Sequence, residues 1–373
     1  MRHRSEIKAF MLQLRKELQS ARREPMNRKN VEQNAALYRL PRMFAPESPM
    51  NAPSSLRYYP DSKPGIARRR CGRGFSYFAP DGACIKDKVE RERLVKLAVP
   101  PAYEQVWICP HVNGHLQATG FDARGRKQYR YHPLWSEAQA QEKYASLADF
   151  AETLPRLRRR VRRDLKGELG DRAFALAAAV AMIDRLSLRV GNQVYAKTNR
   201  TYGTLTLKRR HLTLRDGKLQ ASFMAKGGKR VRRQIANRTL MRALEKIRDL
   251  PGADLLTWVD DEGTPRTLTS SALNDYIADA ADVDGFSAKT FRTWAGSVAA
   301  FNVALTHDRP TIKAMAEAAA ERLHNTPTIA RNSYIHPQVI DLCQHPMDLP
   351  EPPDIDDMTQ AERGLLAFLR AQA

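Results

Sequence analysis

Two kinds of hydrophobic pattern divide this chain. Between about residues 56 and 134, apolar positions come in short strand-like runs that end at turn residues such as Pro80-Asp81-Gly82. The runs cover 74–78, 106–109, 115–120 and 127–132. After about residue 136, apolar residues recur at three- and four-residue spacing over long stretches, which is typical of amphipathic helices. The pattern predicts a small sheet domain followed by a larger, mainly helical domain.

A second strand pattern interrupts the helical part. Predicted helices cover about 136–165, 170–188, 237–248, 269–282, 287–304, 309–323 and 358–371. Between the second and the third of them lie strand-like runs at 203–207, 211–214, 219–225 and 231–235. Asp216-Gly217 and Gly227-Gly228 separate some of these runs and favour tight turns. We therefore predict an antiparallel sheet within the helical domain.

The first 55 residues are predicted to form a basic N-terminal extension. A short helix is predicted from Ser5 to Arg23, and four prolines between positions 41 and 53 then interrupt regular structure. The predicted organisation is an extension at 1–55, a β-rich domain at 56–135 and a larger domain at 136–373.

The charge balance favours a polyanionic partner. The 373 residues include 62 Lys and Arg against 41 Asp and Glu, which gives a formal net charge of +21 and a pI of about 10.0. Such a surface attracts phosphates and releases counterions from nucleic acids. Ribosomal, membrane-surface and heparin-binding proteins share this composition, so charge alone does not decide between them.

Signals for membrane insertion or secretion are missing from the sequence. It contains no run of about eighteen apolar residues, and its N-terminus lacks the apolar segment of a signal peptide. We expect an intracellular protein that is not bound to a membrane. The four cysteines form no CxxC pair, so we expect free thiols, and the spacing of Cys109, His111 and His115 matches none of the usual zinc patterns.

Tyr334 is a candidate nucleophile. Attack of a tyrosine on a phosphodiester needs cations around a crowded, negatively charged transition state and an acid for the departing oxygen. Arginine suits the first need because its guanidinium pairs with two phosphate oxygens, and lysine suits the second. Arg189, Lys226 and Arg292 supply these groups from distant positions in the sequence.

Each of these residues also has an ordinary structural explanation. Arg189 follows a predicted helix, where a cation is favourable for the helix dipole, and Lys226 lies in a predicted turn, where lysines are commonly solvated. Arg292 shares a helix face with Lys289, which fits a solvated cationic surface. Tyr334 can equally be a packing aromatic residue with its hydroxyl in water.

The last strand of the first domain interleaves cations with aromatic residues. Alternation places Gln128 and Arg130 on one face and Tyr129 and Tyr131 on the other. Such a strand suits stacking or groove contact with nucleic acid. A half-buried strand with its tyrosines in the core fits the same pattern.

Several ordered motifs resemble the type IB DNA topoisomerase family, specifically its compact poxvirus-like and bacterial branch. They span about residues 65 to 342 and cover 68–75, 106–110, 114–129, 189–192, 201–207, 289–294 and 325–337. The resemblance implies an enzyme that nicks one strand of duplex DNA, holds a 3′-phosphotyrosine link, lets the free end rotate and reseals the strand. It implies that neither a metal nor ATP is required.

The resemblance also implies roles for single residues. Tyr334 matches the nucleophile, Arg189 and Arg292 match the residues that hold the scissile phosphate, and Lys226 matches the acid for the 5′ oxygen. The fifth catalytic position of the family is often histidine and is Asn325 here, whose amide can still donate a hydrogen bond. His324 is adjacent, but the register from the tyrosine favours Asn325.

DNA-contacting positions of the family match further residues of this chain. They are Gln128, Tyr129 and Tyr131 in the first domain and Tyr195 and Lys289 in the second.

The implied fold class is α+β. A small N-terminal β-sheet domain would join a larger, mainly helical catalytic domain with a three-stranded antiparallel sheet, and the two would form a clamp around DNA. We expect a monomer that acts on supercoiled duplex DNA in the cytoplasm, at the nucleoid.

Two alternatives remain at this point. A tyrosine recombinase uses the same chemistry but usually carries His-x-x-Arg where this chain has Lys289-x-x-Arg292. The second alternative is a non-catalytic protein that binds duplex DNA through the same fold.

Overall fold

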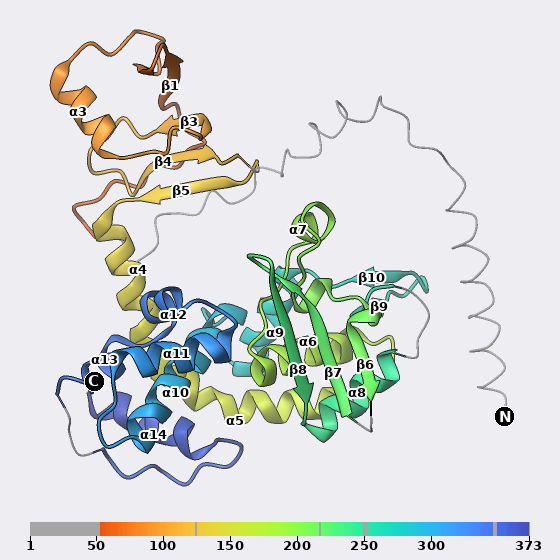
Figure 1. Cartoon of the computed structure of the whole chain (residues 1–373). Coiled ribbons are helices and arrows are strands. Elements are labelled where there is room, and N and C mark those ends of the chain that lie inside the picture. Colours follow the sequence, from red (N-terminus) through yellow and green to blue (C-terminus); the bar gives the residue numbers. More distant parts are fainter. Residues whose placement is uncertain (1–52, 124, 216–217, 249–252, 346–348, 373) are drawn as a thin grey trace. The chain divides into compact units, whose positions relative to one another are not determined.

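The computed structural model describes residues 53–123, 125–215, 218–248, 253–345 and 349–372 (Figure 1). These residues belong to two compact units, and the chain passes from the first to the second between Lys143 and Tyr144. The predicted division after residue 135 falls inside α4 (Pro133–Ala145), which spans the boundary between the units. The helix predicted at Ser5–Arg23, most of the extension to residue 55 and the turn predicted at Asp216-Gly217 lie outside the described residues.

The first unit contains a five-stranded antiparallel sheet in the order β2-β1-β3-β4-β5. Its elements are β1 (Ile66–Cys71), β2 (Gly74–Phe78), α3 (Lys88–Lys96), β3 (Glu104–Ile108), β4 (Leu116–Phe121) and β5 (Lys127–Tyr131). The predicted sheet domain is confirmed, and its four predicted strands correspond to β2, β3, β4 and β5.

Two elements of the first unit were not predicted. β1 carries three consecutive arginines, Arg68 to Arg70, which hide the usual strand alternation. Arg68 turns back to donate to the carbonyls of Val99 and Tyr103 at 2.7 and 3.0 Å. Helix α3 is mostly polar and buries Leu94 alone. Both elements depend on contacts with distant segments, and the local hydrophobic pattern does not predict such contacts.

The second unit is mainly helical. Its helices are α5 (Leu147–Asp164), α6 (Arg172–Leu186), α7 (Gln193–Thr198), α8 (Arg238–Arg248), α9 (Ser270–Ala281), α10 (Ala288–Thr306), α11 (Ile312–Leu323), α12 (Pro327–Tyr334), α13 (Pro337–Asp341) and α14 (Gln360–Ala371). Alanine-rich α6 is buried along most of its length and packs against α5, α8, α9 and α10, because small side chains let neighbouring helices approach on several faces.

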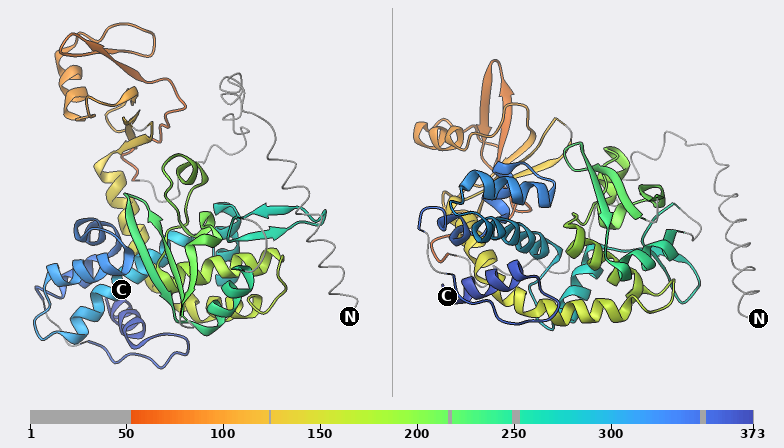
Figure 2. Two further views of the ribbon diagram at one scale, coloured as in Figure 1. Left: turned by 45° about the vertical axis from the view of Figure 1, so that its right-hand side comes forward. Right: turned by 60° about the horizontal axis from the view of Figure 1, so that its bottom comes forward.

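A three-stranded antiparallel sheet, β6-β7-β8, lies beside the helices α10 to α12 in the views of Figures 1 and 2. Its strands are β6 (Leu212–Arg215), β7 (Lys218–Ala225) and β8 (Lys229–Ile235). A short hairpin, β9 (Thr257–Val259) and β10 (Pro265–Thr267), was not predicted. The mixed α+β fold with a three-stranded sheet in the larger part is confirmed.

Two local predictions after residue 135 were wrong. The single helix predicted at 136–165 is two helices, α4 and α5, with Ser146 between them. The strand predicted at 203–207 is a 3-10 turn, η1 (Thr204–Thr206). There the backbone of Thr204 and Leu205 donates to the carbonyls of Arg189 and Val190 at 2.8 and 2.7 Å, so the segment bonds to the chain after α6 instead of to a sheet.

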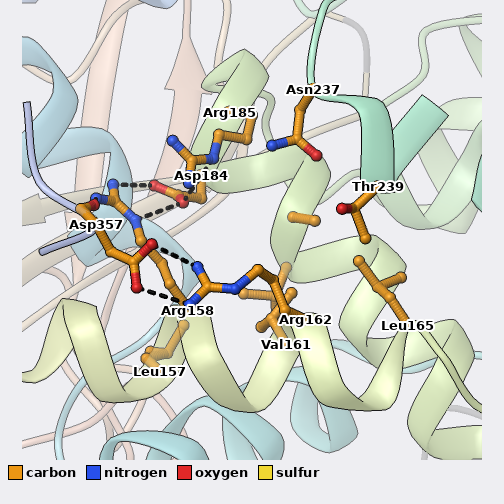
Figure 3. Close-up of a pocket in the computed structure, with 12 residues that line it drawn as sticks. Leu157, Arg158, Val161, Arg162, Leu165, Asp184, Arg185, Asn237, Thr239 and Asp357 are labelled. Atoms are coloured by element: carbon orange, nitrogen blue, oxygen red, sulfur yellow. Dashed lines mark hydrogen bonds and ion pairs between the residues drawn. The ribbon is translucent and has the colours of Figure 1, made fainter.

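Buried ion pairs tie the C-terminal segment to this helical core. The side chain of Arg158 on α5 is 5% exposed and contacts Asp184 on α6 at 2.9 Å and Glu362 on α14 at 2.7 Å. Nearby, Arg162 pairs with Asp357 at 2.6 Å (Figure 3). The indole of Trp294 on α10 donates to Glu362 at 3.3 Å, so one carboxylate joins α5, α10 and α14.

Candidate active site

Tyr334 is the last residue of α12, and its backbone is fixed against α10. The hydroxyl of Thr326 caps α12 by accepting from the Ile329 amide at 3.3 Å, and a proline follows the cap, as is common at helix starts. The Ser297 hydroxyl donates to the Tyr334 carbonyl at 3.3 Å. Gly296 permits this approach, since a β-carbon there would lie 2.6 Å from the same carbonyl oxygen.

Arg292 lies on α10 beside this tyrosine. Its guanidinium carbon is 5.1 Å from the centre of the Tyr334 ring, and the residue is only 4% exposed. It donates to the carbonyl of Ser187 and, at 3.1 Å, to the carbonyl of Leu323. Burial, together with the nearby Arg189, lowers the pKa of Arg292 to about 10, which leaves it cationic near neutral pH. The interpretation of Arg292 as part of a solvated surface is wrong, whereas Lys289 is exposed.

Arg189 reaches the same place from the chain after α6. That helix ends at Ser187 in the left-handed conformation, with φ of 53°. The following residues are held by the turn at η1, and a β-carbon at Gly203 would lie 2.6 Å from the Arg189 carbonyl. Burial lowers the pKa of Arg189, and the neighbouring Tyr334 acts in the opposite direction. Arg189, Arg292 and Tyr334 therefore share one site.

Asn325 follows α11, and its backbone binds that helix and the β7-β8 hairpin. Its backbone amide donates to the Ala320 carbonyl at 2.9 Å, and its side-chain oxygen accepts from the Thr326 backbone amide at 3.2 Å. Its carbonyl accepts a hydrogen bond of 2.8 Å from the Lys229 ammonium on β8. The side-chain nitrogen of Asn325 is buried and has no partner among the described residues.

Lys226 stands in the turn between β7 and β8. Gly227 and Gly228 have φ of 82° and 72°, which makes this tight turn possible. The hairpin is held at the site by Lys229 and by Arg233, which donates to the Glu321 carbonyl at 2.8 Å. Lys226 itself is exposed, and within the described part of the chain its ammonium contacts none of the other four candidates.

His324 is a residue of this site that the sequence interpretation set aside. It caps α11 in the left-handed conformation, with φ of 48°. Burial, followed by the charges of Arg233, Arg292, Arg189 and Arg322, lowers its pKa to about 4. The one signal in the sequence was its place directly before Asn325.

The candidate DNA-contacting residues of the first unit are on the surface. Tyr129 and Tyr131 on β5 are 53% and 43% exposed, and their rings stack with centroids 6.2 Å apart. The Lys127 ammonium lies 5.5 Å from the centre of the Tyr129 ring. Gln128 donates to Asp122 at 3.0 Å. The interpretation that these tyrosines form a core is therefore wrong.

In the second unit, Tyr195 is 38% exposed on α7. That short helix was not predicted, and Asn192 caps it by accepting from the Val194 and Tyr195 amides at 2.9 and 3.3 Å.

All four cysteines are free thiols. The described residues include no group of three His, Cys, Asp or Glu side chains arranged to hold a metal ion. Among the same residues, no helix is long and apolar enough to cross a membrane.

A tyrosine beside the buried Arg292 and the partly buried Arg189 has what a nucleophile needs to attack a phosphodiester and form a phosphotyrosine. A family model described as "Eukaryotic DNA topoisomerase I, catalytic core" matches residues 132–336, which is 205 of the 373 residues. A second, described as "Bacterial DNA topoisomerase IB, N-terminal domain", matches residues 74–122.

Named relatives agree with the family models. DNA topoisomerase 1B of Acanthamoeba polyphaga mimivirus is 28% identical over 296 residues, covering 75% of this chain and 88% of the viral protein. DNA topoisomerase 1B of vaccinia virus is 26% identical over 124 residues, 33% of this chain and 39% of that protein. A solved structure of the XerH site-specific recombinase in a post-cleavage complex has 16% identity and a TM-score of 0.34, covering 50% of this chain and 49% of that chain. That last likeness is too weak to support an inference.

The chain belongs to the type IB DNA topoisomerase family. It is an isomerase that relaxes positive and negative supercoils by transient cleavage of one strand, without ATP or a metal. Both family models describe topoisomerases, which decides against the recombinase alternative.

Proposed function

We propose that this topoisomerase cleaves DNA through Tyr334, with Arg189 and Arg292 holding the scissile phosphate. The phenolic oxygen of Tyr334 attacks phosphorus, the bond to the 5′ oxygen breaks, and a 3′-phosphotyrosine forms. Religation reverses these steps when the free 5′ hydroxyl attacks the phosphotyrosine.

The buried Arg292 beside Tyr334 is the observation that carries this assignment. A guanidinium that is 4% exposed and contacts the tyrosine ring face offers its charge where the phosphorus must lie. In a site shielded from water, such a charge stabilises the transition state more strongly than it would at the surface.

Lys226 is proposed as the acid that protonates the leaving 5′ oxygen, and Asn325 as a donor to a nonbridging oxygen. The hairpin that carries Lys226 is anchored at Asn325 by the contact from Lys229, which supports a position near the phosphate once DNA is bound. The side-chain nitrogen of Asn325, buried and unpartnered among the described residues, supports its role as a donor.

The exposed aromatic residues are proposed as contacts to the duplex. Stacked Tyr129 and Tyr131, the neighbouring Gln128, and Tyr195 and Lys289 in the second unit offer rings and polar groups to bases and phosphates. The motifs shared with compact topoisomerases support action as a monomer, with the two units closing around DNA at the nucleoid.

The purified protein is expected to relax plasmids of either supercoil sign in EDTA without ATP. Tyr334→Phe should abolish relaxation and the covalent protein–DNA adduct, because phenylalanine lacks the attacking oxygen, while duplex binding is retained. Tyr144→Phe is the matched control, since Tyr334 is close enough to help raise the pKa of Tyr144, and this variant should keep the adduct. Gel electrophoresis and adduct trapping in detergent measure both.

If the adduct persists in Tyr334→Phe and disappears in Tyr144→Phe, Tyr334 is not the nucleophile and Tyr144 takes its place. Binding without relaxation across a salt series would favour the non-catalytic alternative.

A further inference from the structure

Three neighbouring side chains of the site carry buried nitrogen atoms without a hydrogen-bond partner among the described residues. They are Nε of Arg292, Nε2 of His324 and Nδ2 of Asn325. An unsatisfied buried polar group costs roughly 1–3 kcal/mol, so a cluster of such atoms is rare in a folded protein. All three nitrogens are able to donate, and a set of donors fits an anion with several acceptor oxygens.

The backbone at His324 is also costly for a histidine. Its φ of 48° lies in the left-handed region, which glycine adopts without the steric penalty of a β-carbon. The same conformation ends α6 at Ser187 and α9 at Asp282, so at His324 it fixes the position of the imidazole and does not by itself mark a site. The imidazole is thus held at a helix end where a smaller residue would be easier to accommodate.

Four arginines from different elements lie close enough to His324 to act on its charge. Arg233 comes from β8, Arg322 from α11, Arg292 from α10 and Arg189 from the chain after α6. The Glu321 carboxylate acts on Arg233, and the Asp184 and Glu362 carboxylates act on Arg322, whereas the largest influences on His324 itself are burial and these arginines. The imidazole is therefore a neutral group with one buried nitrogen in strongly positive surroundings, which fit an anion with several acceptor oxygens such as a phosphate diester.

We propose that His324 is a further phosphate-contacting catalytic residue of this enzyme, whose Nε2 donates a hydrogen bond to a nonbridging oxygen of the scissile phosphate. Asn325 donates to the same phosphate through its amide, so two consecutive residues at the end of α11 act on it. This inference rests on the proposed function of the Tyr334 site and adds one residue to it.

Two variants separate the side chain of His324 from its backbone. His324→Gly keeps the left-handed turn, since glycine adopts this φ readily, and His324→Asn keeps a polar group that tolerates it. His345→Asn, which changes an exposed histidine, is the matched control. The full-length enzyme is tested on a duplex oligonucleotide that carries a cleavage site first mapped with the wild type.

Single-turnover formation of the covalent adduct is expected to be about 10- to 100-fold slower in both His324 variants, the loss typical of one hydrogen bond to a charged group. Duplex affinity and the thermal midpoint should stay near the wild-type values, and His345→Asn should cleave at the wild-type rate. With sulfur in place of one nonbridging oxygen, the penalty should shrink for one phosphorothioate stereoisomer and persist for the other.

Wild-type cleavage rates in both His324 variants would overturn the proposal. So would a penalty that is the same for oxygen and for both sulfur stereoisomers, because a merely structural role does not distinguish the two oxygens. An adduct that survives Tyr334→Phe would instead overturn the proposed function, whatever the result at His324.

Discussion

Arg292 and Arg158 are both buried arginines, and their partners differ in kind. Burial disfavours the charge of Arg158, but Asp184 and Glu362 outweigh it and raise its pKa. Arg292 donates to backbone carbonyls, and none of the ion pairs among the described residues includes it. Its charge is therefore still available to a phosphate. This difference separates a structural arginine from a functional one more clearly than burial does.

The acid role proposed for Lys226 predicts that its contribution to the cleavage rate depends on how much the leaving group needs a proton. Lys226→Ala should slow cleavage by about 100-fold or more on ordinary DNA, because general acid catalysis contributes roughly that factor. A substrate with sulfur at the bridging 5′ position leaves as a thiolate and needs little protonation, so the variant should cleave it nearly as fast as the wild type. Adduct formation under single-turnover conditions measures both.

Lys218→Ala is the control for this comparison, because Lys218 is an exposed lysine at the far end of the same hairpin strand. Equal slowing of Lys226→Ala on both substrates would remove the residue from the acid role.

At the scale of elements, hydrophobic periodicity predicted those helices and strands that bury one face against a core. It placed α8 to α11, α14 and the strands of the three-stranded sheet to within a few residues. It missed α12, which buries Ala330 alone and depends on the Thr326 cap and the contact of its end with α10. The element that carries Tyr334 is thus defined by capping and tertiary contact, and hydrophobic pattern contributes little.

Helix α14 allows a direct test of buried against exposed ion pairs. Glu362→Ala should lower the free energy of unfolding by about 3–5 kcal/mol, because it removes a partner from a buried arginine and from the Trp294 indole. Arg370→Ala on the same helix removes exposed pairs with Asp149 and Glu152 and should cost at most about 1 kcal/mol. Urea unfolding followed by circular dichroism measures both, and similar losses would contradict the distinction.

At the scale of the whole molecule, each unit has its own hydrophobic core. Ile66, Tyr77 and Ile108 belong to the core of the first unit, and a larger core spans α5 to α14 in the second. The net charge of +21 is a property of the whole chain, and it governs the electrostatic attraction between the protein and DNA.

Duplex binding should depend steeply on salt. In the Tyr334→Phe background, affinity is expected to fall about a thousandfold between roughly 50 and 200 mM salt, as for proteins that neutralise six to ten phosphates. Lys289→Ala should reduce the slope of log affinity against log salt by about one, because it removes one cation. Fluorescence anisotropy with a labelled duplex provides the values.

Tyr131→Ala should weaken binding by a similar factor at every salt concentration, because a neutral ring releases no counterion. A slope that changes in Tyr131→Ala and stays constant in Lys289→Ala would reverse these roles.

The sequence by itself determined the two-part organisation, the basic character and the identity of the candidate nucleophile and its arginines. The first two follow from local periodicity and composition, and the candidate residues follow from motifs that resemble the type IB topoisomerase family. The tertiary structure alone decided that Arg292 is buried against Tyr334 and that the Lys226 hairpin is anchored at Asn325. It also decided that His324, near four arginines, has a side-chain nitrogen with no partner among the described residues. Burial and electrostatic surroundings arise where α10, α11, β8 and the chain after α6 meet, and no local pattern encodes that meeting.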